Sequence, residues 1–311
     1  MAWRYRLGVR RLEELGLQVV NAPHSLKGSA FLSQHPEARA EDFQWAFENP
    51  EVKAIIANVG GCDSHRLLPF LHAEWVQKHP KILIGTSDVM NLHIFCYKNG
   101  LSSFYGGNLL SPVADPEGWH PYSREWFRKV LFDGEPIGKI HPASEWTYDP
   151  VDYPNKKQRR TYDPCDGYTL IQGERRVQGR LLGGHTGLME LENTVLALTA
   201  EDFYQKILFV KDIPEFFTPA AAAGFFEWMG SNGVLQALSG VVIGRIQQAG
   251  GFQFHAAAIR QVMERYGRLD LPILYGLHFG HTSPACVLPY GAMAEIDCQQ
   301  RTFTILEEGV I

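Results

Sequence analysis

The first 110 residues alternate between stretches with apolar side chains at helical spacing and short apolar runs. Leu7, Val9, Leu12 and Leu15 recur at helical spacing within residues 4–15. By the same patterns the sequence predicts helices at 40–47, 65–77 and 89–99, and strands at 18–20, 53–58 and 81–84. Strands that alternate with helices build a mostly parallel sheet with covered faces. We therefore predict an N-terminal α/β domain over residues 1–110.

A different pattern begins near residue 167, where short strands become more frequent than helices. Strands are predicted at 168–174, 177–182, 240–245, 272–277, 292–297 and 302–306, and helices near 219–229 and 254–266. The preceding residues 111–166 are rich in Pro, Trp, Tyr and Asp and are interpreted as a connector that borders the cleft. The sequence therefore predicts a β-rich C-terminal domain over residues 167–311.

Composition narrows the class of protein. The chain has 311 residues, of which 45% are hydrophobic and 20% charged, which is enough for two packed domains. A net charge of -5 argues against binding a nucleic acid polymer through a basic surface. The apolar runs fall short of the ~20 residues that span a bilayer, and the N-terminus has no signal-peptide pattern. Five scattered cysteines without a C-x-x-C motif favour the reduced cytoplasm.

Ser87 lies in the tetrapeptide Gly-Thr-Ser-Asp at 85–88, between the predicted strand 81–84 and the predicted helix 89–99. A serine on a strand–turn–helix elbow presents its hydroxyl at the sheet edge, near backbone N–H groups that favour negative charge. The alternative is that Ser87 is an ordinary helix N-cap, because Ser and Asp are common there.

Two other loops follow predicted strands in the same way. Gly60 and Gly61 follow the strand at 53–58, where backbone amides can face a ligand without a side chain between, or can form a plain turn. His278 and His281 follow the strand at 272–277. A metal site at these two histidines is not expected, since positions i and i+3 of a strand point to opposite faces. A glycine loop, a serine elbow and a histidine loop are the components of an acyl-transfer site.

In this order the motifs resemble those of a known family. The Gly-Gly loop, P-K…G-x-S-D at 80–88, G-R-L-L-G-G at 179–184, I-L-F-V at 207–210, G-V-V-I-G-R at 240–245 and F-G-H-T-S-P-A-C-V-L-P-Y-G at 279–291 resemble the LD-carboxypeptidases. The segments 142–147 and 170–174 are similar to the MccF-like branch. The resemblance implies an α/β domain followed by a domain built around a small β-barrel, and a homodimer. It also implies a Ser–His–Glu triad that uses no metal or cofactor, and one further strand before the first helix, without which a neighbouring strand would have an unpaired edge.

The resemblance assigns roles to individual residues. It implies that Ser87 is the nucleophile and His281 the general base, with the amides of Gly61 and Asp88 forming the oxyanion hole. The Asp88 side chain is expected to cap the following helix. His278 is expected to be packed, and Cys62, beside the glycine loop, to be a buried and unreactive thiol.

Three further residues are candidates for substrate binding: Gly60 in the glycine loop, His185 after G-R-L-L-G-G, and Trp146 in the connector. Trp146 lies where the MccF-like branch presents an aromatic ring to a nucleotide. Packing between domains is the alternative for this ring.

Lys211 stands where the resemblance implies the triad glutamate. A protonated lysine cannot accept the imidazole N–H and repels a charged ring, whereas a carboxylate stabilises the imidazolium. Three interpretations follow: a weak or inactive relative, a deliberately substituted form of an active enzyme, or a site in which Asp212 or Glu215 replaces the glutamate.

The resemblance therefore implies a serine peptidase that cleaves an amide at the C-terminal end of a small peptide conjugate, with activity impaired at Lys211. The substrate is either a muropeptide or a peptidyl-nucleotide. The alternative is a catalytically inactive binding protein that retains the peptidase cleft.

Overall fold

A computed structural model describes residues 2–248 and 250–310. The chain divides into two compact units: Met1–Trp119 with Asp152–Arg159, and His120–Val151 with Arg160–Ile311. The mixed α/β architecture with parallel strands confirms the predicted fold class. Among the described residues, no helix is long and apolar enough to cross a membrane.

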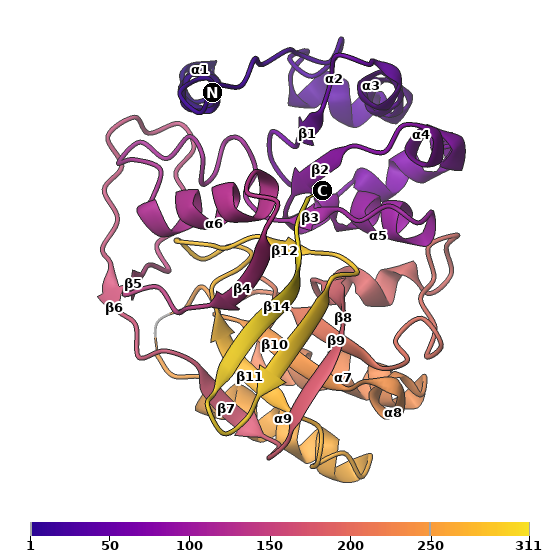
Figure 1. The fold of residues 1–311 in the computed structure, drawn as a ribbon, viewed down its shortest axis with the longest axis vertical. Coiled ribbons are helices and arrows are strands. Elements are labelled where there is room, and N and C mark those ends of the chain that lie inside the picture. Colours follow the sequence, from indigo (N-terminus) through magenta and orange to yellow (C-terminus); the bar gives the residue numbers. More distant parts are fainter. Residues whose placement is uncertain (1, 249, 311) are drawn as a thin grey trace. The chain divides into compact units, whose positions relative to one another are not determined.

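The N-terminal unit contains a short parallel sheet with helices around it (Figure 1). Its strands pair in the order β1–β2–β3, with Ala54 opposite Ile82 and Ile84 opposite Phe104. The elements are α1 (Ala2–Glu13), α2 (Ser29–Gln34), α3 (Pro36–Glu48), β1 (Ala54–Ile56), η1 (Ser64–Phe70), α4 (Ala73–Lys78), β2 (Ile82–Gly85), η2 (Ser87–Val89), α5 (Met90–Lys98) and β3 (Phe104–Tyr105).

Helix α1 fully buries only Leu12 of the apolar residues in the predicted pattern. Its buried residues are Arg4, Gly8 and Leu12, one turn apart. Arg4 is accommodated because its Nε donates to the Leu110 carbonyl at 2.7 Å. Gly8 lets Leu109 approach, since a Cβ there would lie 2.8 Å from its Cδ1.

Two predictions for this unit need correction. Residues 18–20 belong to no described strand and Val20 is 55% exposed, because a short apolar run forms a strand only where a neighbour completes its hydrogen bonds. The helix predicted at 65–77 is two elements, η1 and α4, separated by Leu71 in an extended conformation just after Pro69.

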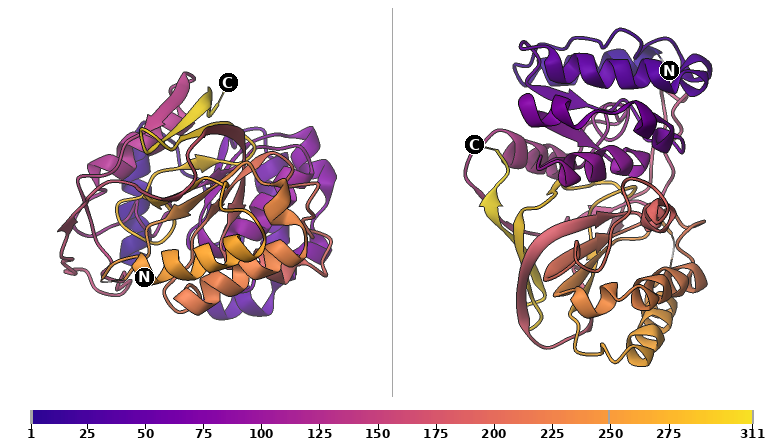
Figure 2. Two further views of the ribbon diagram at one scale, coloured as in Figure 1. Left: turned by 90° about the horizontal axis from the view of Figure 1, so that it is seen from below. Right: turned by 90° about the vertical axis from the view of Figure 1, so that its right-hand side faces the viewer.

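The C-terminal unit is organised around one eight-stranded mixed sheet. Its order is β4-β14-β13-β8-β9-β10-β11-β7, in which β8, β9, β10 and β11 are parallel neighbours. The right-hand view of Figure 2 shows the strong bend of β8. The strands of the unit, of which β5, β6 and β12 are not part of this sheet, are β4 (Pro136–Ile140), β5 (Glu145–Trp146), β6 (Asp163–Pro164), β7 (Thr169–Gln172), β8 (Arg176–Gly184), β9 (Lys206–Val210), β10 (Gly240–Gly244), β11 (Ile273–Leu277), β12 (Leu288–Pro289), β13 (Met293–Asp297) and β14 (Thr302–Glu308).

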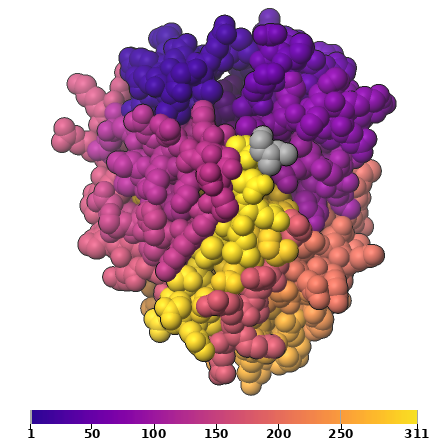
Figure 3. Space-filling model, in the orientation of Figure 1, coloured from indigo at the N-terminus to yellow at the C-terminus, as the bar shows by residue number. Residues whose placement is uncertain are grey.

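Helices α7 and α9 of this unit lie side by side, as both views of Figure 2 show. The helical elements of the unit are α6 (Pro121–Leu131), η3 (Thr186–Leu191), α7 (Pro219–Ser231), α8 (Val234–Ala237) and α9 (Gln253–Arg265). The predicted connector, residues 111–166, contains α6 and β4. Strand β4 pairs with β14, and the two segments lie together on the face shown in Figure 3.

Candidate active site

Ser87 occupies a strained position directly after β2. Its φ is +64°, a left-handed conformation that is rare for residues other than glycine and is found where the surrounding structure enforces it. Thr86 and Asp88 on either side are buried, whereas Ser87 is partly exposed. The Ser87 N–H donates to the Tyr105 hydroxyl at 3.2 Å. The N-cap residues of η2 and α5 are Thr86 and Val89, so Ser87 is not in the N-cap position of either helix.

The glycine loop packs directly against this serine. A Cβ at Gly60 would lie 2.8 Å from the Ser87 Cβ and 3.2 Å from its Oγ. Only glycine therefore lets the backbone of this loop come so close to the hydroxyl. This contact brings Gly60 and Ser87 together as the sequence predicts, and gives the glycine a role beyond that of a plain turn.

Asp88 connects the same loop to the elbow by hydrogen bonds. Its Oδ2 accepts hydrogen bonds from the backbone N–H groups of Asp63 at 3.0 Å and Ser64 at 2.8 Å. The Ser64 hydroxyl donates to the Asp88 carbonyl at 2.5 Å. The expectation that this carboxylate caps its own following helix was wrong, because the free N–H groups at the start of η1 lie within its reach. Gly61 lies beside this carboxylate, since a Cβ there would be 3.3 Å from the Asp88 Oδ2.

In the C-terminal unit, parallel strands bring the remaining candidates to one sheet edge. His185 follows β8, Lys211 follows β9, and His281 lies four residues after β11. The carboxyl ends of neighbouring parallel strands meet at the same edge. The topology therefore gathers two histidines and a lysine from segments distant in sequence.

Lys211 is fully buried at this edge. Its methylene groups lie against two glycines: a Cβ at Gly244 would be 2.6 Å from Lys211 Cγ, and one at Gly280 would be 2.7 Å from Cδ. Among the residues that the structure describes, the Nζ has no hydrogen-bond partner. Burial lowers the pKa of Lys211 well below its usual value, and the nearby Asp212 carboxylate opposes this shift.

His281 is electrostatically coupled to this lysine. The pKa of His281 is lowered well below its usual value, first by removal of the ring from water and then by Lys211 and His185. Its Nδ1, the position at which a triad carboxylate would accept, has no hydrogen-bond partner within the described ranges. The arrangement therefore disfavours a positive charge on His281, the charge that a general base acquires.

Neither of the two carboxylates considered as substitutes for the triad glutamate, Asp212 and Glu215, has a hydrogen bond to His281 among those found for the described residues. Asp212 Oδ2 accepts from the backbone N–H and the hydroxyl of Thr186, and Oδ1 accepts from the Ile213 N–H at 2.8 Å. Asp212 also lies 3.8 Å from His185 Nδ1. Glu215 is exposed. Asp212 therefore ties the loop after β8 to the loop after β9, and its oxygens are already engaged.

Trp146 is packed inside the C-terminal unit. It is 8% exposed, and the Arg245 guanidinium lies 4.9 Å from its ring centroid. Its sequence neighbourhood did not reveal Arg245, which is 99 positions away and reaches Trp146 only through the fold.

The cysteine beside the glycine loop was predicted incorrectly. Cys62 is exposed rather than buried. His278, in contrast, is fully buried, as expected for a packed residue.

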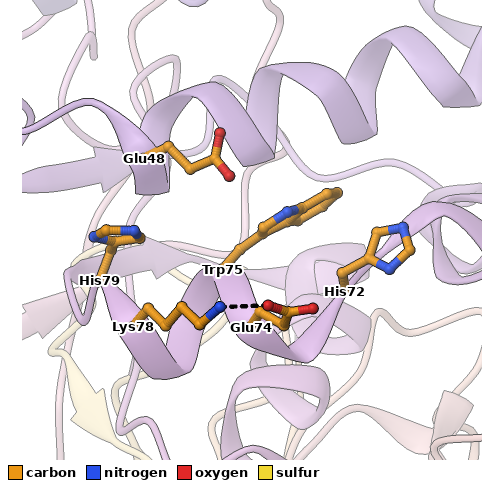
Figure 4. A pocket seen from close by; sticks show the side chains of 6 residues that line it. All are labelled: Glu48, His72, Glu74, Trp75, Lys78 and His79. Atoms are coloured by element: carbon orange, nitrogen blue, oxygen red, sulfur yellow. Dashed lines mark hydrogen bonds and ion pairs between the residues drawn. The ribbon is translucent and has the colours of Figure 1, made fainter.

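A separate surface pocket lies between the end of α3 and helix α4 (Figure 4). Trp75 and His72 meet edge to face there, with ring centroids 5.0 Å apart, and Lys78 pairs with Glu74 at 2.5 Å. The pocket is lined by Glu48, His72, Glu74, Trp75, Lys78 and His79. None of these residues belongs to the serine elbow or to the histidine edge.

Both units of the chain are similar to known proteins. Residues 1–106 match the model of the LD-carboxypeptidase N-terminal domain, and residues 178–296 match that of the LD-carboxypeptidase C-terminal domain. The putative carboxypeptidase YocD of Bacillus subtilis is 31% identical over 94% of this chain and 88% of its own length. The microcin C7 self-immunity protein MccF of Escherichia coli is 26% identical over 98% of this chain and 88% of its own.

A solved structure agrees with these matches. An MccF-like protein from Streptococcus pneumoniae, crystallised in complex with AMP, superposes with a TM-score of 0.86 at 27% identity, covering 97% of this chain and 92% of its own. The family models together match more than half of the chain, and the order of their domains is that of the two units. The chain belongs to the LD-carboxypeptidase family.

Proposed function

We propose that this chain is a serine-type hydrolase that cleaves an amide at the C-terminal end of a small peptide conjugate, and that Lys211 slows it. The observation that carries the proposal is the left-handed Ser87 with Gly60 packed against its side chain. Strain of this kind is retained where it exposes a nucleophile. The relatives named as carboxypeptidases support the same class of reaction.

In the proposed mechanism Ser87 Oγ attacks the amide carbonyl while His281 takes its proton. The amides of Gly61 and Asp88 donate to the oxyanion, and His281 returns the proton to the leaving amine. No step requires a metal or cofactor. Lys211 acts on the charged intermediate: the imidazolium forms beside a group that offers no negative charge, so the attack is slower than with a carboxylate at this position.

For the substrate we propose a peptidyl-nucleotide rather than a muropeptide. The MccF-like protein crystallised with AMP supports this choice, as does the Trp146–Arg245 pair, which presents an aromatic ring beside a fixed positive charge. Other relatives, named as murein peptide carboxypeptidases, support the muropeptide. The assay must therefore include both.

The test is hydrolysis of an aminoacyl sulfamoyl adenosine, whose acyl group is attached to the nucleoside part through nitrogen, and of a tetrapeptide ending in D-alanine, followed by mass spectrometry of the products. We expect the wild-type chain to release the amine of the first substrate slowly, and the Ser87→Ala chain to release none above background. Labelling by a fluorophosphonate gives a second readout, since it should modify Ser87 and be lost in His281→Ala. Equal hydrolysis by wild type and Ser87→Ala would contradict the proposal.

Lys211 also favours a second candidate, a binding protein without turnover. A buried lysine with an unpartnered Nζ next to the general base is the specific observation. In that case the wild-type chain would bind the conjugate in a calorimetric titration as tightly as Ser87→Ala, and neither chain would cleave it. Cleavage by the wild type above the Ser87→Ala background would exclude this candidate.

A further inference from the structure

A cysteine that the proposed mechanism does not use has the positive charge of Arg245 beside its sulfur. Cys165 follows β6 in the C-terminal unit, and its backbone N–H donates to the Ser144 carbonyl at 3.0 Å. The Arg245 Nη2 donates to the Cys165 Sγ at 3.1 Å, and the His278 Nε2 lies 3.3 Å from the same sulfur. The side chain is partly exposed, so small solutes reach it.

Arg245 is held in place by groups that do not titrate near neutral pH. Its Nη2 also donates to the Gly167 carbonyl at 3.0 Å. The guanidinium lies 4.9 Å from the Trp146 ring centroid and 5.9 Å from that of Tyr275. A guanidinium held between two aromatic rings keeps its charge directed at the sulfur.

His278 supplies a neutral acceptor rather than a second charge. Burial, and then the charge of Arg245, lower the pKa of His278 to about 3, so the ring is neutral at pH 7. A neutral Nε2 can accept a hydrogen bond from the thiol. The sulfur therefore has a hydrogen-bond acceptor on one side and a cation on the other.

The other four cysteines lack this combination. Cys62 is exposed, and no hydrogen bond to a basic side chain is found for it among the described residues. Cys96, Cys286 and Cys298 are buried, and burial raises the pKa of each thiol, that of Cys286 to about 12. Reactive thiols are those in electropositive, partly exposed surroundings, and Cys165 alone among the five has both features.

We propose that Cys165 is a site of oxidation by hydroperoxides. The sulfur attacks one peroxide oxygen, the O–O bond breaks, and the thiol proton leaves with the displaced oxygen as water, which gives Cys165 sulfenic acid and one molecule of water per hydrogen peroxide. An oxygen added on the side of Arg245 would not fit within the 3.1 Å between Sγ and Nη2, so the modification would displace the guanidinium from the sulfur.

The test treats the whole chain with dilute hydrogen peroxide in the presence of dimedone, and quantifies the labelled cysteine peptides by mass spectrometry. Cys62 serves as the control within the same molecule. We expect Cys165 to be labelled at least ~10-fold faster than Cys62, although Cys62 is the more exposed thiol. Faster or equal labelling of Cys62 would overturn the proposal.

Two variants test whether Arg245 and His278 cause the fast oxidation of Cys165. Arg245→Gln should slow labelling of Cys165 by about 5-fold or more and leave Cys62 unchanged, since it removes the charge that stabilises the attacking sulfur. His278→Gln should slow Cys165 less. An unchanged Cys165 rate in folded Arg245→Gln would refute the role of the guanidinium. The same measurement on Ser87→Ala should give wild-type rates, so the result does not depend on hydrolysis.

Discussion

Asp88 in the N-terminal unit and Lys211 in the C-terminal unit are both buried ionisable side chains, at 8% and 0% relative exposure. Asp88 accepts hydrogen bonds from the backbone of Asp63 and Ser64 and holds the glycine loop against Ser87. The Lys211 Nζ, in contrast, has no such partner among the described residues. A buried polar group normally has a hydrogen-bond partner, so one without a partner marks a position with a requirement other than stability. The elbow therefore has a buried carboxylate with hydrogen-bond donors around it, whereas the histidine edge has a buried amine without an acceptor among the described residues.

The sharpest test of this comparison changes Lys211 to glutamate. We expect Lys211→Glu to raise kcat/KM on the adenylate conjugate by at least ~10³-fold, since a carboxylate stabilises the imidazolium of His281. Lys211→Gln is the matched control, because it removes the amine without adding a negative charge, and it should give an intermediate rate. If all three chains cleave at the same rate, another carboxylate must serve the histidine, and Asp212→Asn is then the variant to assay.

Removing the Asp88 carboxylate from the elbow should lower the activity, whereas Lys211→Glu should raise it. In a chain with measurable activity, such as Lys211→Glu, adding Asp88→Ala should reduce kcat by ~10²-fold, because the glycine loop is no longer held at the serine. The free energy of unfolding should fall by about 2 kcal/mol, as two backbone N–H groups lose their acceptor. Asp88→Asn keeps one oxygen and should lose less of both. Rates and urea denaturation curves that match the parent chain would show that the loop is positioned without Asp88.

The sequence was sufficient to locate the residues of the serine elbow, but not the contacts that their side chains make. Ser87, Gly60 and Gly61 lie within 28 positions of one another, so a strand–turn–helix pattern locates them. The hydrogen-bond partners of the Asp88 carboxylate depend on where η1 begins, and the periodicity of apolar residues does not show that position. Contacts such as Cys165–His278 join residues 113 positions apart and follow only from strand order.

Stability should respond to Lys211 with a characteristic pH dependence. The pKa of Lys211 is lowered in the folded chain, so the unfolded chain binds more protons between that lowered value and the usual 10.5. Wild-type stability therefore rises with pH in this window and is lost as pH falls through it. Lys211→Met should raise the free energy of unfolding by about 1–4 kcal/mol at pH 7, and the gain should shrink toward pH 10. Urea denaturation at several pH values measures it, and a pH-independent difference would argue against an uncompensated amine.

The smallest effect is expected at Trp146. Trp146→Ala in the Ser87→Ala background should weaken binding of an adenylate conjugate by about 1 kcal/mol, roughly fivefold, because only part of this packed ring can meet a base. Binding of the D-alanine tetrapeptide should not change. Calorimetric titration of both ligands measures the difference, with Trp75→Ala in the other unit as the matched control. Equal weakening of both ligands would assign Trp146 to packing alone.

The two glycines beside Lys211 have a consequence for how this position can vary. Gly244 and Gly280 leave a slot along the stem of residue 211 where any other residue would project a Cβ to within 2.6–2.7 Å of the lysine methylenes. A slot bounded by backbone accepts unbranched side chains of several lengths, so lysine, glutamate, glutamine and methionine can exchange there without moving a strand. The side chain at position 211 can therefore be exchanged without a change in the backbone that surrounds it.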